Sequence, residues 1–292
     1  HEALEKFSKK LQENGETWKT VTDDTRDRLI EECVEETMAD YGNTIFQSSS
    51  RNQYRIIRVK RILKRTVWAL QQQIRQGEFE PGEFEVSFSM EDSLSAINID
   101  LSEHEKMRLR GRIDRVDLCE TDDKVYVKII DYKTGNTSLD LVALYYGLQL
   151  QLVLYLEAAM AMAAKRNPNR KLIPAGIYYY NMKDPIVSGF DMTKEEIEAK
   201  QQKELRMNGL TSTEKASLLL IDAEGGNVVS GLEYKKDGSL SSRALVANAD
   251  QMHELGHFAR KKALDLARDI YGGKIDAYPY EYKKMNPCEY CE

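Results

Sequence analysis

Two short stretches in the middle of the chain bring acids and a lysine together. The first reads GRIDRVD (111–117) and contains Asp114, and the second reads IDYKTG (130–135) and contains Asp131 and Lys133. Alternate residues of a β-strand point to the same face, so Asp131 and Lys133 are expected to emerge side by side. If the two strands pair as a hairpin through residues 120–123, Asp114 comes to lie near Asp131.

Two convergent carboxylates are costly unless a cation lies between them. Mg²⁺ prefers oxygen ligands and keeps several waters, and a bound Mg²⁺ or Mn²⁺ can polarise a phosphate and acidify a ligated water. A neighbouring lysine can orient or deprotonate that water, or neutralise charge that develops on the phosphate. The pattern therefore indicates in-line hydrolysis of a phosphodiester. An ordinary hairpin with charged surface residues is the alternative.

A third motif makes the pattern more specific. Gln151 and Tyr155 stand four residues apart, which places them on one face of a helix that follows the lysine strand. With them, the two stretches resemble the RecB-type branch of the PD-(D/E)XK nucleases. The resemblance implies that Asp114 and Asp131 bind the metal and that Lys133 is the catalytic lysine. It also implies that Gln151 and Tyr155 form the family's Gln-x-x-x-Tyr motif, directed at the DNA or the lysine. Helix packing is the alternative for these two, above all for Tyr155.

The same resemblance implies two further ligands, a fold and an activity. The family has a metal-ligating histidine on an early helix, which His1 would supply, and a backbone carbonyl ligand at the position of Tyr132. The implied fold is α/β and restriction-endonuclease-like, with a mixed central sheet flanked by helices. The implied activity is that of a metal-dependent deoxyribonuclease, an exonuclease with Mg²⁺ or Mn²⁺ as cofactor and a single DNA strand in its active site.

Within this branch, residues 111–155 resemble the AddB subunits of bacterial AddAB helicase–nucleases. That resemblance implies a module that works with an AddA-type helicase–nuclease subunit in double-strand-break repair and recombination. It also implies a [4Fe–4S] cluster held by four cysteines, one upstream of the histidine helix and three near the C-terminus.

Cys288 and Cys291 match two of those cluster ligands. The other two would lie before His1 and after Glu292, so we expect a fragment of a longer protein. Two thiolates cannot complete a four-cysteine set, so we also expect this chain to lack the cluster. Half a zinc site or a redox pair is the alternative for Cys-x-x-Cys. The remaining two cysteines are isolated, which without a secretory signal indicates reduced thiols in a cytoplasmic protein.

A basic helix is expected from about residue 51 to 75, after a serine cap signal at 48–50. No acid stands between residues 51 and 75, and four arginines fall near one face at helical spacing: Arg51, Arg55, Arg58 and Arg65. These arginines could track the phosphates of DNA. A solvated charged helix face is an equally good interpretation.

A second metal chemistry is suggested by HELGH (253–257). His253 and His257 on one helical face, with Glu254 between them, match the pattern of zinc proteases. The extended motif needs glycine and histidine at offsets where Arg260 and Ala263 stand. An amphipathic helix is the simpler interpretation, and a zinc metalloprotease is kept as an alternative function. A non-catalytic DNA-binding module is another.

Composition limits the classes of protein to consider. The 292 residues, 41% hydrophobic and 31% charged, suffice for one large domain with a well-buried core. The net charge of −6 argues against non-specific polyanion binding by the whole surface, but not against a local basic groove. No apolar run approaches the roughly 20 residues of a membrane span, so no membrane partner is expected.

Hydrophobic patterning divides this single nuclease domain (1–292) into four parts. We expect a helical region at 1–80, a catalytic α/β core at 83–190, an insertion with little core at 191–250, and a C-terminal helix with the partial iron–sulfur cysteine segment at 251–292. Within the core, alternation predicts a strand through Phe84, Val86, Phe88 and Met90. A strongly apolar, buried helix is expected from about residue 139 to 164.

Overall fold

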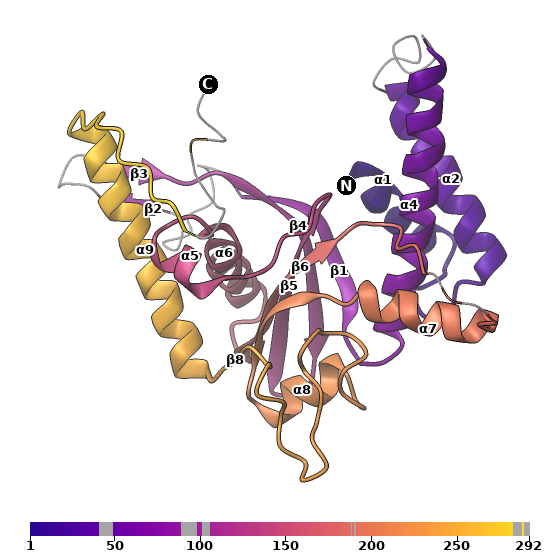
Figure 1. Ribbon diagram of the computed structural model, residues 1–292. Helices are drawn as coiled ribbons and strands as arrows, with labels where there is room; N and C mark the ends of the chain where they lie inside the picture. The colour runs from indigo at the N-terminus through magenta and orange to yellow at the C-terminus, as the bar shows by residue number, and fades with distance from the viewer. Residues whose placement is uncertain are drawn as a thin grey trace.

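The computed structural model describes residues 1–40, 49–88, 98–100, 106–187, 189, 191–282 and 288 (Figure 1). Its helices are α1 (Glu2–Glu13), α2 (Asp23–Asp40), α4 (Ser50–Ile74), α5 (Leu141–Tyr145), α6 (Gln151–Arg166), α7 (Lys194–Glu204), α8 (Lys215–Ile221) and α9 (Ala249–Tyr271). Its strands are β1 (Glu80–Phe88), β2 (Asn98–Asp100), β3 (Lys106–Arg108), β4 (Gly111–Glu120), β5 (Lys124–Lys133), β6 (Lys171–Asn181), β7 (Asn208–Ser212) and β8 (Val246–Ala247). Within the described residues, no helix combines the length and the apolar character that a membrane span requires.

A six-stranded sheet forms the centre of the described structure, in the order β1-β4-β5-β6-β7-β8. The β1–β4, β4–β5 and β6–β7 pairs are antiparallel, whereas the β5–β6 and β7–β8 pairs are parallel. Helices α5 and α6 connect β5 to its parallel neighbour β6. The mixed central sheet flanked by helices that the sequence predicted is thus confirmed.

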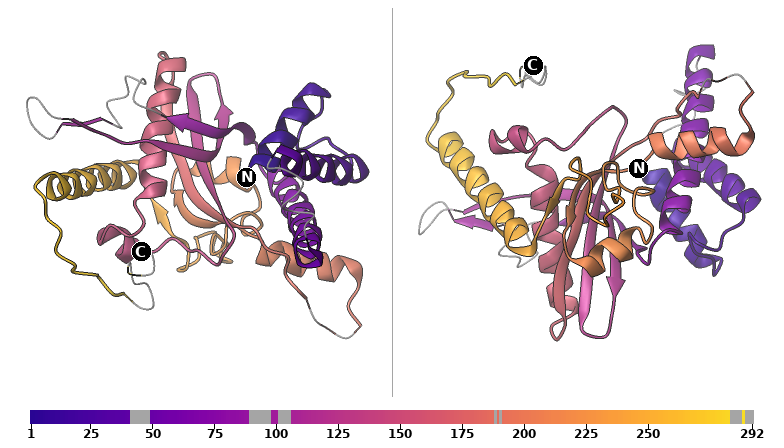
Figure 2. Two further views of the ribbon diagram at one scale, coloured as in Figure 1. Left: turned by 90° about the horizontal axis from the view of Figure 1, so that it is seen from above. Right: turned by 60° about the horizontal axis from the view of Figure 1, so that its bottom comes forward.

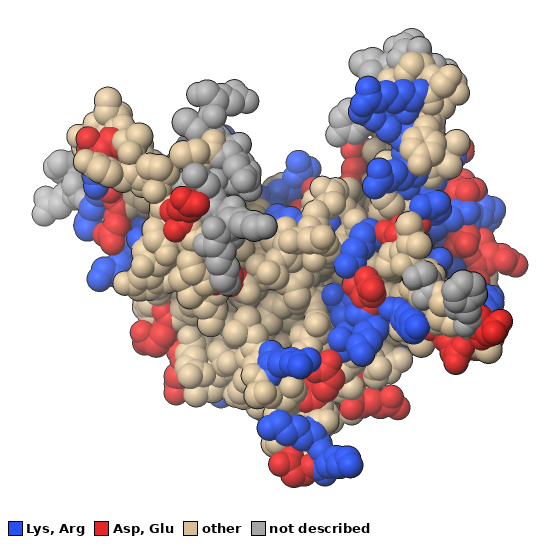
Figure 3. Space-filling view, in the orientation of Figure 1, with Lys and Arg blue, Asp and Glu red and all other residues tan. Residues whose placement is uncertain are grey.

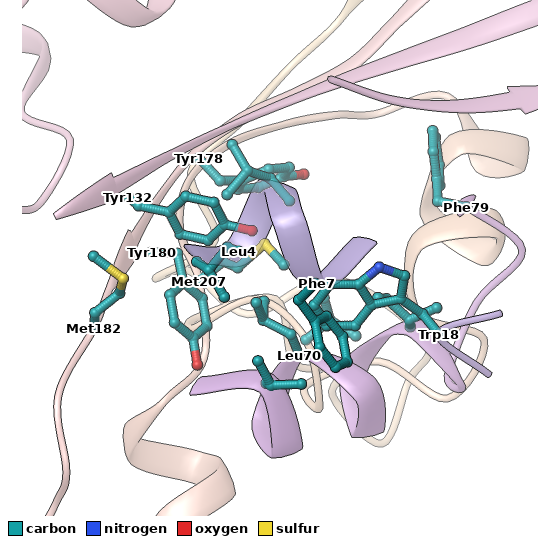
Figure 4. Close-up of a cluster of buried hydrophobic side chains, with 14 of the residues drawn as sticks. Leu4, Phe7, Trp18, Leu70, Phe79, Tyr132, Tyr178, Tyr180, Met182 and Met207 are labelled. Atoms are coloured by element: carbon teal, nitrogen blue, oxygen red, sulfur yellow. The ribbon is translucent and has the colours of Figure 1, made fainter. Parts of the chain in front are cut away.

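Helices cover both faces of this sheet (Figures 1 and 2). On one face, α1 and α4 pack side chains against aromatic residues of the sheet; the buried set in Figure 4 includes Leu4, Phe7, Trp18, Leu70, Tyr132, Tyr178 and Tyr180. On the other face, α6 buries Leu152, Val153 and Leu156 against strands β5 and β6, and α9 packs outside α6. The sheet therefore has two separate apolar cores, one on each side.

The long basic helix is confirmed as α4, whose N-cap Ser49 accepts a hydrogen bond from the backbone of Asn52. The single helix predicted for residues 139–164 is wrong, because α5 and α6 are separate. Gly147 between them has a φ of 87°, a left-handed conformation that glycine adopts at little cost and that ends α5. The break lets α6 begin at Gln151, beside the end of β5.

Residues 191–250 contribute more to the core than their polar composition suggested. Strands β7 and β8 from this stretch extend the main sheet. Val228, Val229 and Leu232 are buried with the core on the α1 side, and Leu210 is buried with the core on the α6 side. A few apolar residues at strand and loop positions were enough, and their spacing followed neither a helical nor an alternating pattern. The boundaries proposed for this region stay a prediction.

Candidate active site

Strand β1 is kinked at Glu85, so that the side chains before and after this residue point to opposite faces of the sheet, whereas regular alternation would place them on one face. This residue has a φ of 50°, in the left-handed region that non-glycine residues seldom adopt. As a result Phe84 packs with the core on the α1 side, whereas Val86 and Phe88 pack with the core on the α6 side. The strand predicted through these residues is confirmed as β1, with Phe84 on the opposite face from Val86 and Phe88; Met90 lies outside the described residues.

Three potential metal ligands meet at this kink. His1 Nδ1 lies 3.1 Å from Asp114 Oδ1 and 3.7 Å from Glu85 Oε1. One ligand atom from each of the three residues lies within 4.8 Å of the other two. The register places Glu85 across from Asp114, because Phe84 pairs with Arg115 and Val86 with Ile113. We call these three residues the His1–Glu85–Asp114 cluster.

Asp114 is held at the end of its strand by a backbone donor. The N–H of Tyr132 donates to Asp114 Oδ2 over 2.7 Å. The β4–β5 pairing is antiparallel, with Arg115 opposite Ile130, so the next step of the same register brings Asp114 toward Asp131. The hairpin arrangement predicted from the sequence is confirmed, and with it the approach of the two acids.

The second acid and the lysine form a short polar chain with α6. Lys133 Nζ lies 2.5 Å from Asp131 Oδ2, and it donates to Gln151 Oε1 over 3.3 Å. The amide of Gln151 donates to the hydroxyl of Tyr155 over 2.8 Å. The structure thus brings together the four residues predicted around the lysine, with Gln151 fixed between Lys133 and Tyr155.

Burial and the negative charge of Asp114 raise the pKa values of two acids at this site, Asp131 and Glu85. Burial raises the pKa of Asp131, and the nearby Lys133 ammonium only partly opposes it. Burial, followed by the negative charge of Asp114, raises the pKa of Glu85. The hydrogen bond to Asp114 raises the pKa of His1 against the effect of burial. Burial therefore makes the charged forms of Glu85 and Asp131 costly, and a bound cation would stabilise them.

The donor set suits a divalent cation. Glu85 Oε1 and Asp131 Oδ2 are buried and have no hydrogen-bond partner, although Lys133 approaches the second of them as an ion pair. Carboxylate oxygens with an imidazole nitrogen are suitable ligands for Mg²⁺ or Mn²⁺. Asp131 stands outside the compact three-residue group of the described structure. It lies close enough for its charge to act on His1.

Gly111 gives Tyr155 the room that it occupies. A Cβ at this position would lie 2.5 Å from the ring of Phe88 and 3.0 Å from the ring of Tyr155. These two rings meet edge to face at a centroid distance of 5.8 Å. The glycine of GRIDRVD is therefore explained by packing beneath the Gln151–Tyr155 pair.

A second charged group lies in the core directly behind the site. Asp117 receives two hydrogen bonds from Arg115, at 2.5 and 2.8 Å, and Lys128 Nζ lies 3.0 Å from its Oδ2. All three side chains are at least 95% buried. Arg115 also donates to the hydroxyl of Tyr132 over 3.3 Å. We call Arg115, Asp117 and Lys128 the buried ion group.

The arginines of α4 fall along one arc of a continuous helix, as their spacing requires, but their surroundings differ. Arg65 lies 3.7 Å from Asp184 and its guanidinium covers the ring of Trp68, so packing accounts for it. Arg55 lines the cleft beside the His1–Glu85–Asp114 cluster, whereas Arg58 lines a different one. Arg51 is exposed.

Acids from a neighbouring helix offset part of this positive charge. Lys60 and Lys64 of α4 pair with Glu35 and Glu31 of α2. Figure 3 shows lysine and arginine side chains spread over the lobe formed by α2 and α4, with acids among them. The positive charge of this surface is therefore smaller than the sequence of α4 alone suggests, because acids of α2 lie beside it. The DNA-binding role of the four arginines stays a prediction.

The histidines of HELGH do meet, on the exposed surface of α9. His253 Nε2 and His257 Nε2 lie 3.0 Å apart. Among the described residues, however, no third histidine, cysteine or acid completes a metal-binding group there. A zinc protease needs three protein ligands, so this alternative gains no support.

The cysteine segment is only partly visible in the structure. Cys288 is exposed, and Cys291 lies outside the described residues. Cys33 and Cys119 are buried without a disulfide, and burial raises the pKa of Cys33 to about 11. The iron–sulfur assignment therefore stays a prediction.

Glu85 is the site residue that sequence reasoning missed. It stands between Phe84 and Val86, where strict alternation makes it a residue of the solvent face. The register of β1 on β4 would have identified it, because a register with Phe84 opposite Arg115 places Glu85 opposite Asp114. Only knowledge of that register, and of the kink, identifies it as a ligand candidate.

Comparison with known proteins agrees with this geometry. The whole chain, residues 1–292, matches the family model of the PD-(D/E)XK nuclease superfamily. Relatives that are each named as one subunit of an ATP-dependent helicase/deoxyribonuclease are 42% identical in Lachnoclostridium phytofermentans, 35% in Clostridium botulinum and 34% in Acetivibrio thermocellus. These alignments cover 100% of this chain and 25–26% of each relative, so the chain spans about a quarter of their length. They confirm the predicted resemblance and the restriction-endonuclease-like fold class, and the chain belongs to the PD-(D/E)XK nuclease superfamily.

Proposed function

We propose that this chain is the nuclease module of a helicase–nuclease and hydrolyses phosphodiester bonds of DNA with a divalent metal ion. The observation that carries the proposal is the meeting of the His1–Glu85–Asp114 cluster with Asp131 and Lys133 at the kinked end of β1 and β4. Membership of a nuclease superfamily, and the deoxyribonuclease named in the relatives, support the same reaction.

In this proposal Mg²⁺ or Mn²⁺ is held by His1, Glu85, Asp114 and Asp131, with the backbone carbonyl of Tyr132 as a further ligand. When bound, the ion polarises the phosphate and lowers the pKa of a ligated water. The chain's own contribution is to bring carboxylates, imidazole and ammonium to one point, where burial disfavours the charged carboxylates unless a cation is bound.

Lys133 serves the attacking water in this scheme. Its ammonium orients the water or balances the charge that develops on the phosphate oxygens. A donor that is already in place before the reaction does this without further reorganisation. Gln151 accepts one N–H of Lys133 and Asp131 pairs with the same ammonium, which leaves its third N–H available for substrate. Tyr155 fixes the amide of Gln151 and so acts through it. Lys133 is the catalytic residue, and Gln151 and Tyr155 are positioning residues.

We propose an exonuclease that receives a single DNA strand from a helicase, in double-strand-break repair and recombination. The partner would be an AddA-type helicase–nuclease subunit, and the setting the bacterial cytoplasm. Cys288 and Cys291 would supply two of the four cysteine ligands of a [4Fe–4S] cluster. Support comes from the relatives, whose names each describe one subunit of an ATP-dependent helicase/deoxyribonuclease.

The test is degradation of end-labelled single-stranded DNA by the 292-residue chain, with Mg²⁺, with Mn²⁺ and with EDTA. We expect cleavage with either metal and none with EDTA. Asp131→Ala should reduce the rate to roughly a hundredth or less, because both a ligand and the lysine's partner are lost. Asp122→Ala, at an exposed hairpin residue, is the control and should cleave normally. Equal rates for the two variants would contradict the proposal.

A further inference from the structure

We infer that the cleft beside the His1–Glu85–Asp114 cluster binds a base of the single DNA strand whose phosphate lies at the cluster. This inference rests on the proposed function and adds to it a subsite that receives one unpaired base. The cleft has a volume of about 860 Å³ and lies between α1, α2, α4 and β1. That volume is within the range of roughly 300–1,000 Å³ that small-molecule sites occupy.

The cleft opens directly on the metal-binding cluster, because His1 and Glu85 line both. A nucleotide whose phosphate approaches these residues must place its sugar and base on one side of them. Among the described residues, this cleft is the one that adjoins the cluster on the side of α4. The cleft and the phosphate position are therefore adjacent parts of one binding surface.

Two arginines supply positive charge along this surface. Arg112, next to the first glycine of GRIDRVD, holds Glu85 at 3.0 Å with 64% of its side chain exposed. Arg55 projects from α4 into the lining of the same cleft, and no ion pair occupies it among the described residues. Guanidinium groups bind phosphate oxygens through paired N–H donors and also stack on base planes.

The walls of the cleft are mostly apolar; they are formed by Ala3, Val34, Met38, Ile56, Val59 and Leu63. Such walls exclude water from the faces of a base, and Thr37 and Asn52 in the lining can reach its polar edge. Glu2 and Glu5 also line the cleft, but each pairs with the lysine one turn later, Lys6 and Lys9. Phosphate is therefore favoured on the arginine side of the cleft, and the base on the apolar side.

A base can enter this cleft only when it is unpaired and unstacked. That condition is met along a single strand, whereas a duplex would have to be opened first at a cost of a few kcal/mol per base. The arrangement of cation, apolar wall and metal-binding acids therefore favours single-stranded DNA over duplex, independently of the helicase that delivers it.

The first experiment compares two arginines of the same helix. Arg55 and Arg58 are both exposed on α4, but only Arg55 lines this cleft. Binding of fluorescent single-stranded oligothymidylate of about 12 nucleotides is measured by anisotropy in EDTA, so that no cleavage occurs. Arg55→Ala should weaken binding about fivefold and reduce the slope of log Kd against log salt by about 0.7. Arg58→Ala should leave both nearly unchanged.

The second experiment separates the base from the phosphate. Val59 lines the cleft with 45% exposure, whereas Ile57 on the same helix is 65% exposed and lines another. Val59→Gln should weaken oligothymidylate binding roughly fourfold, because an apolar contact is lost. It should not change binding of an abasic tetrahydrofuran polymer of the same length. Ile57→Gln should affect neither probe.

The outcomes distinguish binding of DNA in the cleft from non-specific electrostatic attraction of DNA to the basic helix α4. Equal losses for Arg55→Ala and Arg58→Ala, equal effects of Val59→Gln on the two probes, or no measurable binding of oligothymidylate would overturn the inference. Because these measurements are made without metal, they stand apart from the Asp131→Ala cleavage test. Cleavage that depends on Asp131 with no contribution from the cleft would remove only the inference. Cleft-dependent binding without metal-dependent cleavage would remove only the proposed reaction.

Discussion

Strand β4 carries two groups of charged side chains one residue apart. Near the kink of β1, Asp114 joins Glu85 and His1, and burial raises the pKa of Glu85, whose buried Oε1 has no hydrogen-bond partner. One residue later Arg115 begins the buried ion group, in which every carboxylate oxygen of Asp117 has a cationic partner. The same strand thus holds an incomplete charge arrangement at the surface and a nearly complete one in the core.

The difference shows which acids are available for a metal ion. Unpaired buried carboxylates are costly, and they persist where a ligand or the surrounding fold compensates them. The buried ion group needs no further cation, because Arg115 and Lys128 already surround Asp117. Burial even lowers the pKa of Lys128, against the attraction of Asp117. The kinked end is therefore the part of β4 that we propose binds the metal ion, and the buried ion group lies behind it in the core.

Loss of Lys133 should have the largest effect, and that effect should be on the cleavage rate and not on the buried ion group. Lys133→Ala should reduce the cleavage rate by about 10²–10⁴-fold with a much smaller effect on Tm, because its side chain is 30% exposed and meets the core only at the ring of Tyr179 and at Asp131. Lys124→Ala, at the other end of β5 and equally exposed, is the control. Measured rates that fall equally for both lysines would remove the distinction between the two groups.

Neutralising the central acid of the buried ion group should act on stability instead. Asp117→Asn leaves Arg115 and Lys128 buried without their counter-charge, so the free energy of unfolding should fall by about 3–5 kcal/mol. Chemical denaturation measures this, with Asp122→Asn as the exposed control, expected within about 0.5 kcal/mol of the parent. A stable Asp117→Asn variant that has lost Mn²⁺ binding would mean that the two groups form one site.

The third comparison lies within β1. Glu85→Gln should weaken Mn²⁺ binding about tenfold or more, measured by titration calorimetry, because a charged ligand at the kink is lost. Glu83→Gln, two residues earlier and paired with Arg166, should bind Mn²⁺ as the parent does. If Glu83→Gln has the larger effect, the acids at the kink are not the ones that hold the ion.

Sequence patterns predicted the site better than they predicted its surroundings. The family resemblance singled out the site residues; a period of two along a strand put Asp131 and Lys133 on one face, and a period near four along a helix did so for Gln151 and Tyr155. Glu85 could not be found in that way, because its place depends on a positive φ and on the β1–β4 register. Both are tertiary features that composition does not express.

The helices show the same limit. The boundaries of α4 were predicted well, because Ser49 caps it and its apolar residues repeat at helical spacing. Its ion pairs with Glu31 and Glu35 were not, because those acids come from α2. The division between α5 and α6 was also missed, since Gly147 alone in an apolar run is a weak signal.

The smallest effect should come from the outermost member of the polar chain. Tyr155→Phe removes the hydroxyl that accepts from Gln151 but keeps the ring that packs on Phe88. One hydrogen bond contributes about 0.5–1.5 kcal/mol, so kcat should fall about threefold to tenfold, with KM, Mn²⁺ affinity and Tm unchanged. Tyr145→Phe, at an exposed tyrosine of α5, should behave as the parent.

A positioning role requires more than a loss of rate. If Tyr155 acts by fixing the amide of Gln151, then Tyr155→Phe should have little further effect once Gln151→Ala has removed that amide, since the two changes break the same chain. Additive losses in the double variant would assign Tyr155 a separate contact with DNA. An unchanged rate for Tyr155→Phe would leave it a packing residue, and the polar chain that distinguishes the metal-binding side would then end at Gln151.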